Sequence, residues 1–293
     1  MEREVKNLLR ERRLWPKKKL GQNFLIDAEV MDDILAAADL SPEDTVVEVG
    51  PGLGLMTREL AKRAGTVIAV ELDPELAHTI AEMAVQLPNI VALQGNILDL
   101  STAELIGQAQ AVRPNTGIRA YKVVANLPYY ITSPVLRHFL EERHKPQSMV
   151  VMVQKEVAQR IAAKPGDMSI LAVSVQVYAH PSIVRYVPAR SFYPVPEVDS
   201  AVVRLDVYDK PAVNVDDMEA FFRMIHAGFA RGRKMLHNAL PRGMWLPPGG
   251  AQEALEEAGI DSRRRAETLD LGEWERLYWA IRHIVTEARA KPQ

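Results

Sequence analysis

Glu48-Val49-Gly50-Pro51-Gly52-Leu53-Gly54 is the stretch that decides the fold of this chain. It joins an apolar run over residues 45–49, which predicts a buried strand, to an amphipathic pattern over residues 55–64, which predicts a helix. Glycines at positions 50, 52 and 54 let the backbone pass close to a ligand and bring the helix N-terminus towards it. Glu71 ends the next predicted strand, 21 residues after Gly50. An acid at that place in such sheets accepts hydrogen bonds from the ribose hydroxyls of a bound nucleoside.

The rest of the first two-thirds of the chain alternates strand-like and helix-like segments. Strands are predicted over residues 45–49, 66–71, 89–94, 121–125, 148–153, 184–186 and 198–207, and helices over residues 27–40, 55–64, 74–86, 132–141 and 155–163. This alternation predicts an α/β fold with a parallel sheet covered by helices on both faces. From residue 215 onward only helical periodicity remains. We therefore expect a Rossmann-like domain over residues 1–208, with a basic extension over residues 1–26, and a small all-helical C-terminal domain over residues 209–293.

Composition places the chain among soluble globular proteins. Of its 293 residues 47% are hydrophobic and 25% are charged. It has no cysteine, which excludes disulfides and thiolate metal sites. No apolar run is long enough to span a bilayer, and the charged N-terminus has no apolar signal core. We expect a cytoplasmic protein with no membrane association.

Basic residues are clustered although the net charge is only −2. Residues 1–19 carry eight basic and three acidic side chains, and Arg263-Arg264-Arg265 lies near the C-terminus. Between residues 222 and 242 there is no acid, and the basic residues are Arg223, Arg231, Arg233, Lys234 and Arg242. Such clusters are typical of proteins that bind a polyanion, although any one of them equally fits a solvated helix face.

Asn126-Leu127-Pro128-Tyr129, followed by Tyr130, lies at the end of the predicted strand over residues 121–125. An amide, a proline-fixed turn and an aromatic ring therefore meet at the carboxyl edge of the sheet. The ring suits stacking on a base, while the Asn126 side-chain oxygen and the Leu127 carbonyl can accept from an exocyclic amine. An ordinary turn is the alternative, since Asn and Pro are common turn formers.

The glycine loop also indicates which nucleoside is bound. The dinucleotide pattern requires Gly or Ala where this chain has Leu55, which disfavours NAD and FAD. The form Glu-x-Gly-x-Gly-x-Gly instead resembles the first motif of S-adenosylmethionine-dependent methyltransferases. Asn96, just beyond the third predicted strand, can accept from the cofactor's adenine amine through its amide oxygen. Helix capping is its alternative role, which Asp99 fits better.

Together these residues resemble the small-subunit ribosomal RNA adenine dimethyltransferases, the KsgA family. The resemblance covers almost the whole chain and is carried by the glycine loop, by Asn126 to Tyr130, and by residues 18–25, 154–160 and 192–202. It implies a methyltransferase domain and a helical C-terminal domain, and from the basic clusters we expect the helical domain to contact RNA. It also implies four methyl transfers from S-adenosylmethionine, two to each of two adjacent adenosines near the 3′ end of the small-subunit RNA in a pre-ribosomal particle.

The resemblance also implies roles for single residues. Asn23 and Leu25 would close over the cofactor, and its site would be lined by Gly50, Gly52, Glu71, Asn96 and Asn126. The family usually has an acid at position 96. Asn126 and Leu127 would hold the target amine, Pro128 would fix the turn, Tyr129 would stack on the base, and Phe192 would form a second wall. Phe192 equally fits a core aromatic before a turn. We expect a monomer without a metal.

Three other functions stay open. A large-subunit dimethylase that confers antibiotic resistance shares the fold and a similar tetrapeptide, but Leu127, Tyr130 and residues 192–202 favour the small-subunit enzyme. A non-catalytic RNA-binding assembly factor would not need the intact glycine loop, Glu71 and Asn126. A small-molecule or protein methyltransferase would not need the basic clusters.

Overall fold

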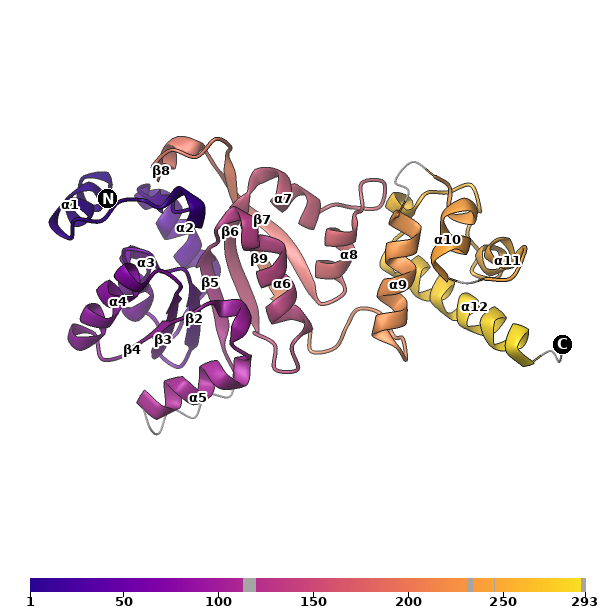
Figure 1. Cartoon of the computed structure of the whole chain (residues 1–293), viewed down its shortest axis with the longest axis horizontal. Helices are drawn as coiled ribbons and strands as arrows, with labels where there is room; N and C mark the ends of the chain where they lie inside the picture. The colour runs from indigo at the N-terminus through magenta and orange to yellow at the C-terminus, as the bar shows by residue number, and fades with distance from the viewer. Residues whose placement is uncertain (113–119, 231–233, 245, 291–293) are drawn as a thin grey trace. The chain divides into compact units, whose positions relative to one another are not determined.

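The computed structural model describes residues 1–112, 120–230, 234–244 and 246–290, with the backbone alone at residues 242 and 287–290. The chain divides into two compact units (Figure 1). The first comprises Met1–Gln159 and Ala179–Tyr208, and the second comprises Arg160–Tyr178 and Asp209–Gln293.

A seven-stranded sheet forms the centre of the first unit. Its strands are β2 (Thr45–Val49), β3 (Thr66–Glu71), β4 (Ile90–Gln94), β5 (Lys122–Asn126), β6 (Ser148–Gln154), β7 (Ala179–Val187) and β9 (Ser200–Val207). They lie in the order β4-β3-β2-β5-β6-β9-β7. The first five are parallel, whereas β9 is antiparallel to both β6 and β7. The predicted α/β class with a mainly parallel sheet is confirmed.

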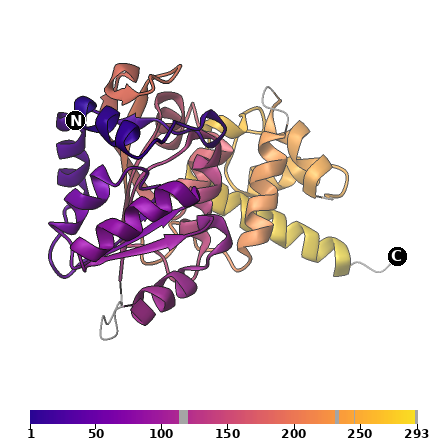
Figure 2. The ribbon, with the colours of Figure 1, turned by 60° about the vertical axis from the view of Figure 1, so that its left-hand side comes forward.

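Helices connect successive parallel strands (Figures 1 and 2). They are α3 (Leu55–Ala61), α4 (Pro74–Gln86), α5 (Thr102–Val112) and α6 (Thr132–Glu141), of which α5 was not predicted. The helices α1 (Glu2–Glu11), which was also not predicted, and α2 (Ala28–Ala38) precede β2, and α7 (Lys155–Ile161) follows β6. Aspartates cap two of them: Asp27 accepts from the Glu29 and Val30 amides at the start of α2, and Asp73 accepts from the Glu75 amide at the start of α4.

One core cluster fixes these helices to the sheet. It joins valines on one face of the strands to apolar residues of α2, α3 and α4, among them Val46, Val67, Val124, Val150, Ile34, Leu60 and Ile80. A short second sheet adds the N-terminal segment, because β1 (Phe24–Leu25) pairs antiparallel with β8 (Phe192–Tyr193). Residues distant in sequence are thereby brought to the carboxyl edge of the large sheet.

The second unit is all helical. Its helices are α8 (Ile170–Gln176), α9 (Met218–Phe229), α10 (Leu236–Met244), α11 (Gly250–Glu257) and α12 (Leu271–Ala290). Trp274 and Tyr278 of α12 and Phe221 of α9 are among its most buried side chains. This unit is the helical C-terminal part that the sequence predicts.

The division between the units differs from the predicted boundary after residue 208 in one respect. Residues 160–178, predicted to lie in the first domain, are grouped with the C-terminal helices. The Glu267 carbonyl accepts from the Gly166 amide at 2.8 Å and from the Met168 amide at 3.1 Å. The Ala212 amide donates to Val177, and α8 contacts α9. The two bonds to Glu267 join segments about 100 residues apart, which a boundary read from local composition does not detect.

Candidate active site

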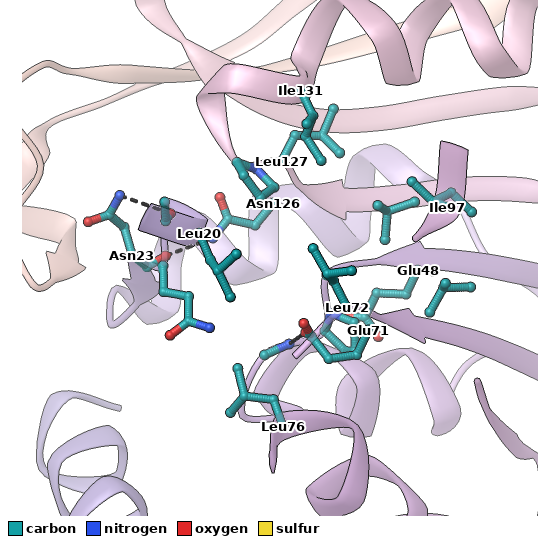
Figure 3. A pocket seen from close by; sticks show the side chains of 18 of the residues that line it. Leu20, Asn23, Glu48, Glu71, Leu72, Leu76, Ile97, Asn126, Leu127 and Ile131 are labelled. Carbon is teal, nitrogen blue, oxygen red and sulfur yellow. Dashed lines mark hydrogen bonds between the residues drawn. The ribbon is translucent and has the colours of Figure 1, made fainter. Parts of the chain in front are cut away.

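Four parallel strands end at one edge of the sheet beside a cavity (Figure 3). Residues from the ends of β2, β3 and β5, from the turn after β4 and from the N-terminal segment line it. They include the predicted residues Asn23, Leu25, Gly50, Gly52, Glu71, Asn96, Asn126, Leu127, Pro128 and Tyr129. The structure therefore brings together every predicted site residue except Phe192.

Glu71 and the glycine loop form one hydrogen-bonded unit. The Gly52 amide donates to Oε2 of Glu71 at 3.0 Å, and the Asp73 amide donates to Oε1 at 2.9 Å. Gly52 has a φ of +60°, and a Cβ there would lie 3.1 Å from the Phe24 ring, so only glycine fits. Burial raises the pKa of Glu71, while the backbone donors oppose the rise. Each carboxylate oxygen keeps acceptor capacity for a ribose hydroxyl.

Asn96 uses its side chain to cap the short helix η2 (Ile97–Asp99). Its Oδ1 accepts from the Leu98 amide at 3.2 Å, and its Nδ2 donates to Asp99 at 3.2 Å. The sequence attributed capping of the next helix, near Ser101, more readily to Asp99; there the Ser101 hydroxyl accepts from the Glu104 amide at 3.3 Å, so Asp99 is not that cap. Asn96 also lines the cavity. Its side-chain oxygen has a second lone pair, which can accept a hydrogen bond from a donor in the site.

Asn126 is oriented by the N-terminal segment. Its Nδ2 donates to the backbone carbonyl of Asn23 at 3.0 Å, and the two residues face each other in Figure 3. The amide nitrogen is thereby occupied and Oδ1 is left to accept from a ligand. Asn23 itself donates from Nδ2 to the Gly21 carbonyl at 3.3 Å. The bond from Asn126 joins residues 103 apart, and no local sequence signal predicts it.

Tyr129 begins the helix η3 (Tyr129–Ile131) and is half-buried beside the cavity. Its hydroxyl makes a 2.8 Å hydrogen bond with the Ser200 hydroxyl at the start of β9. Burial raises the pKa of Tyr129, so the phenol stays protonated near neutral pH. Ser200 is fully buried and holds the phenol oxygen, and with it the long axis of the ring, a role that sequence reasoning did not assign. Tyr130 is 56% exposed.

Phe192 does not line this cavity. It is 1% exposed, belongs to the hydrophobic core and pairs with Leu25 between β8 and β1. Of its two predicted roles, the packing role agrees with this position. Its neighbour across the short sheet, Leu25, does line the cavity, so Phe192 supports the wall from behind.

Asp73 connects the N-terminal segment to the cofactor side of the cavity. Its Oδ1 accepts from Lys17 Nζ and its Oδ2 from Gln22 Nε2, both at 2.9 Å. The Lys17 amide in turn donates to the Gln22 side chain at 2.8 Å. These bonds hold the segment that carries Asn23 against the start of α4. Sequence reasoning missed Asp73, although its position two residues after Glu71 could have suggested a role.

The basic clusters differ in whether their residues form ion pairs with acidic side chains. Each residue of the 263–265 cluster forms an ion pair, with Asp261, Glu273 and Glu267 respectively. In the N-terminal cluster Lys18 and Lys19 are exposed near the cavity residue Leu20. Of the cluster between residues 222 and 242, Arg231 and Arg233 and the side chain of Arg242 lie outside the described residues.

Among the described residues, no group of three or more His, Asp or Glu side chains could hold a metal ion. No helix in the described part of the chain combines the length and apolar character needed to cross a bilayer.

Comparison with known proteins gives the family. Residues 15–282 match the family described as "Ribosomal RNA adenine dimethylase". The chain belongs to the ribosomal RNA adenine dimethylase family. The chain is also 49% identical over 274 residues to "Ribosomal RNA small subunit methyltransferase A" of Dehalococcoides mccartyi strain CBDB1, covering 94% of this chain and 91% of that relative. A relative with the same name from Moorella thermoacetica is 44% identical, covering 94% and 96%.

Solved structures agree with this assignment. "Crystal structure of 23S rRNA methyltransferase ErmE" is 29% identical with a TM-score of 0.69, covering 89% of this chain and 100% of that chain. A dimethyladenosine transferase from Plasmodium falciparum has the same fold, with a TM-score of 0.75, 23% identity, and coverage of 89% and 98%. The predicted family and fold are therefore confirmed, and the dimethylase family is a family of S-adenosylmethionine-dependent methyltransferases.

Proposed function

We propose that this dimethylase transfers two methyl groups from S-adenosylmethionine to the exocyclic amine of each of two adjacent adenosines near the 3′ end of small-subunit ribosomal RNA. The observation that carries the proposal is the amide of Asn126. Its nitrogen is occupied by the Asn23 carbonyl, so its oxygen is available beside the half-buried Tyr129 ring. An acceptor next to a flat apolar face matches an adenine whose NH2 group is to be methylated.

The residues of the cavity fit the methyl donor. Glu71 would accept from the ribose hydroxyls, Asn96 would accept from the adenine amine, and the glycine loop would lie along the methionine part. Two features of the structure support this fit: the close backbone approach at Gly52, and the buried acid Glu48, which lines the cavity that would hold the positively charged donor. When bound, the donor would supply an electrophilic methyl on its sulfonium.

The protein's contribution is to orient the amine and the base. Asn126 Oδ1 and the Leu127 carbonyl would accept the two amine hydrogens. These bonds would draw the hydrogens out of the ring plane and localise the nitrogen lone pair towards the methyl. Tyr129 would stack on the base, with its phenol oxygen held by Ser200. Positioning and preorganised acceptors can lower such a barrier by several kcal/mol.

No strong base is needed in this scheme. The amine nitrogen becomes acidic only after it has been alkylated, when its proton can pass to water. After one transfer the pocket holds a methyl where a hydrogen had been.

The relatives decide between the two RNA targets. The nearest rival is a large-subunit dimethylase, because ErmE shares the fold at 29% identity. The relatives named for the small-subunit enzyme reach 49% and 44% identity over nearly the whole chain. We therefore propose the small-subunit target, with a pre-ribosomal particle as the partner, a monomer as the active form and the cytoplasm as the location.

Primer extension on ribosomal RNA from cells with and without the gene tests the target. Doubly methylated adenines stop reverse transcriptase, so we expect two adjacent stops near the 3′ end of the small-subunit RNA that vanish on deletion. Return of the stops on expression of the chain, but not of its Asn126→Ala variant, would assign them to this site. Stops in the large-subunit RNA instead would support the rival function.

A further inference from the structure

Glu48 is a buried acid that has no ion-pair partner among the described residues. It lies near the end of β2, two residues before Gly50, and its relative exposure is 0%. Neither carboxyl oxygen has a hydrogen-bond partner among the described residues, and the Thr57 hydroxyl of α3 also lacks one. The same residue lines the cavity together with Gly50 and Glu71 (Figure 3). A buried, unpaired acid costs several kcal/mol if ionised, so its retention requires a reason.

No cation of the surrounding elements compensates this acid. On α3, Arg58 pairs with Glu4, and Glu59 pairs with Lys62 and Arg63. The charge that acts on Glu48 from β3 is Glu71, which has the same sign.

The remaining neighbours do not neutralise Glu48 either. On α2, Met31 lines the cavity, and Asp33 pairs with Arg185. Across the sheet, Glu48 lies in register with Ala69 of β3 and Val124 of β5, which carry no charge. Burial therefore raises the pKa of Glu48 to about 8; the nearby Thr57 hydroxyl opposes the rise, and the Glu71 charge adds to it. The free site holds a neutral carboxylic acid at and below neutral pH.

We propose that Glu48 is the counter-charge of the methyl donor: the acid is neutral in the free site and loses its proton to solvent when the donor's positive charge enters the cavity. The proposal rests on the proposed donor and adds a residue that acts on it. Protons and charge balance in this step: one carboxylic acid becomes one carboxylate, and one proton passes to the buffer. No covalent bond to the ligand forms. An opposite charge within a few ångströms favours the ionised form of an acid, which drives the step.

Two groups of the donor could provide the positive charge, the sulfonium and the methionine ammonium. The demethylated product keeps the ammonium and lacks the sulfonium. Methylthioadenosine lacks both and keeps the adenosine part that Glu71 and Asn96 would hold. These three ligands separate the sources of charge without relying on turnover.

Isothermal titration calorimetry in two buffers of different ionisation enthalpy measures the proton released. At pH 6.5, where the donor's own amine stays protonated, we expect roughly one proton released per S-adenosylmethionine bound. Methylthioadenosine should release none. Release with the product as well assigns the charge to the ammonium, and release with the donor alone assigns it to the sulfonium, both of which support the proposal.

Glu48→Gln is the decisive variant, because glutamine has the shape of the neutral acid and cannot ionise. We expect it to bind the donor more weakly and to release no proton. Between pH 5.5 and 7 the wild-type affinity should rise by about tenfold per pH unit, whereas the variant should be nearly flat over this range. Glu104→Gln, in the first turn of α5 and outside the cavity, serves as the matched control and should keep the wild-type behaviour.

The outcomes separate this inference from the proposed function. Donor binding without proton release, or equal release by wild-type and Glu48→Gln protein, would overturn the role of Glu48 alone. Proton release with methylthioadenosine equal to that with the donor would overturn it too, since no ligand charge would be involved. Absence of any donor binding by correctly folded wild-type protein would instead remove the proposed function. Thermal unfolding of each variant checks that it is folded.

Discussion

Replacing Asn126 by alanine removes two interactions, and their sizes can be estimated separately. The first is the bond from Nδ2 to the Asn23 carbonyl, a normal part-buried hydrogen bond at 3.0 Å that contributes about 1 kcal/mol to stability. The second is the acceptor Oδ1, which would act on the target amine. Loss of one preorganised polar group in other enzymes lowers kcat by about 10²–10³, or about 2.7–4 kcal/mol. We therefore expect methyl transfer to fall by at least a hundredfold, with donor affinity reduced by less than tenfold.

Asn126→Asp gives a sharper version of the same test. The new carboxylate places an oxygen where Nδ2 was, opposite the Asn23 carbonyl, and only the protonated acid can donate to that carbonyl. The activity of this variant relative to wild type should therefore rise as the pH falls from 8 to 5.5. Single-turnover transfer to small subunits, with donor binding measured by calorimetry, checks both variants. Transfer by Asn126→Ala within threefold of wild type would refute the mechanism.

Three further predictions concern other residues. Glu71→Ala should raise the donor dissociation constant at least tenfold, about 1.4 kcal/mol, and unchanged calorimetric affinity would contradict the ribose assignment. Ser200→Ala should lower the transfer rate and leave donor binding intact, and Tyr129→Phe should have the same defect because each removes one side of their hydrogen bond. For Glu48, whose pKa rises from 4.5 unfolded to about 8 folded, stability is lost as the pH rises through this window. Donor-free Glu48→Gln should therefore gain stability over wild type, by up to about 1.4 kcal/mol per pH unit between pH 5 and 8, and parallel denaturation curves would contradict the buried neutral acid.

Local signals predicted the elements of the fold well. The predicted apolar runs over residues 45–49, 66–71 and 121–125 located β2, β3 and β5, and the predicted helices over residues 27–40 and 74–86 begin within one residue of α2 and α4. What the sequence did not show was the grouping of residues 160–178 with the C-terminal helices, because that grouping depends on bonds such as those from Gly166 and Met168 to Glu267. Contacts over such separations leave no periodic pattern.

The sequence predicted which residues meet at the site, but it did not predict how their side chains are held in place. Motif spacing placed Gly50, Glu71 and Asn126 at one sheet edge, because parallel strands end there together. The orientation of the Asn126 amide depends on the backbone of Asn23, and the Tyr129 ring depends on Ser200. Neither partner is identifiable from residue type. The position of an aromatic in a motif likewise cannot distinguish a cavity wall from a core residue, and Phe192 is in the core.

We expect this site to dimethylate adenosine in small-subunit RNA. Purified protein, S-adenosylmethionine and ribosomal subunits from a strain without the gene can be incubated, and the nucleosides of each RNA quantified by mass spectrometry. We predict two dimethyladenosines gained per small-subunit RNA, none in large-subunit RNA, and none with Asn126→Ala. Dimethyladenosine in the large-subunit RNA alone, or no methylated adenosine with folded, donor-binding protein, would contradict the account.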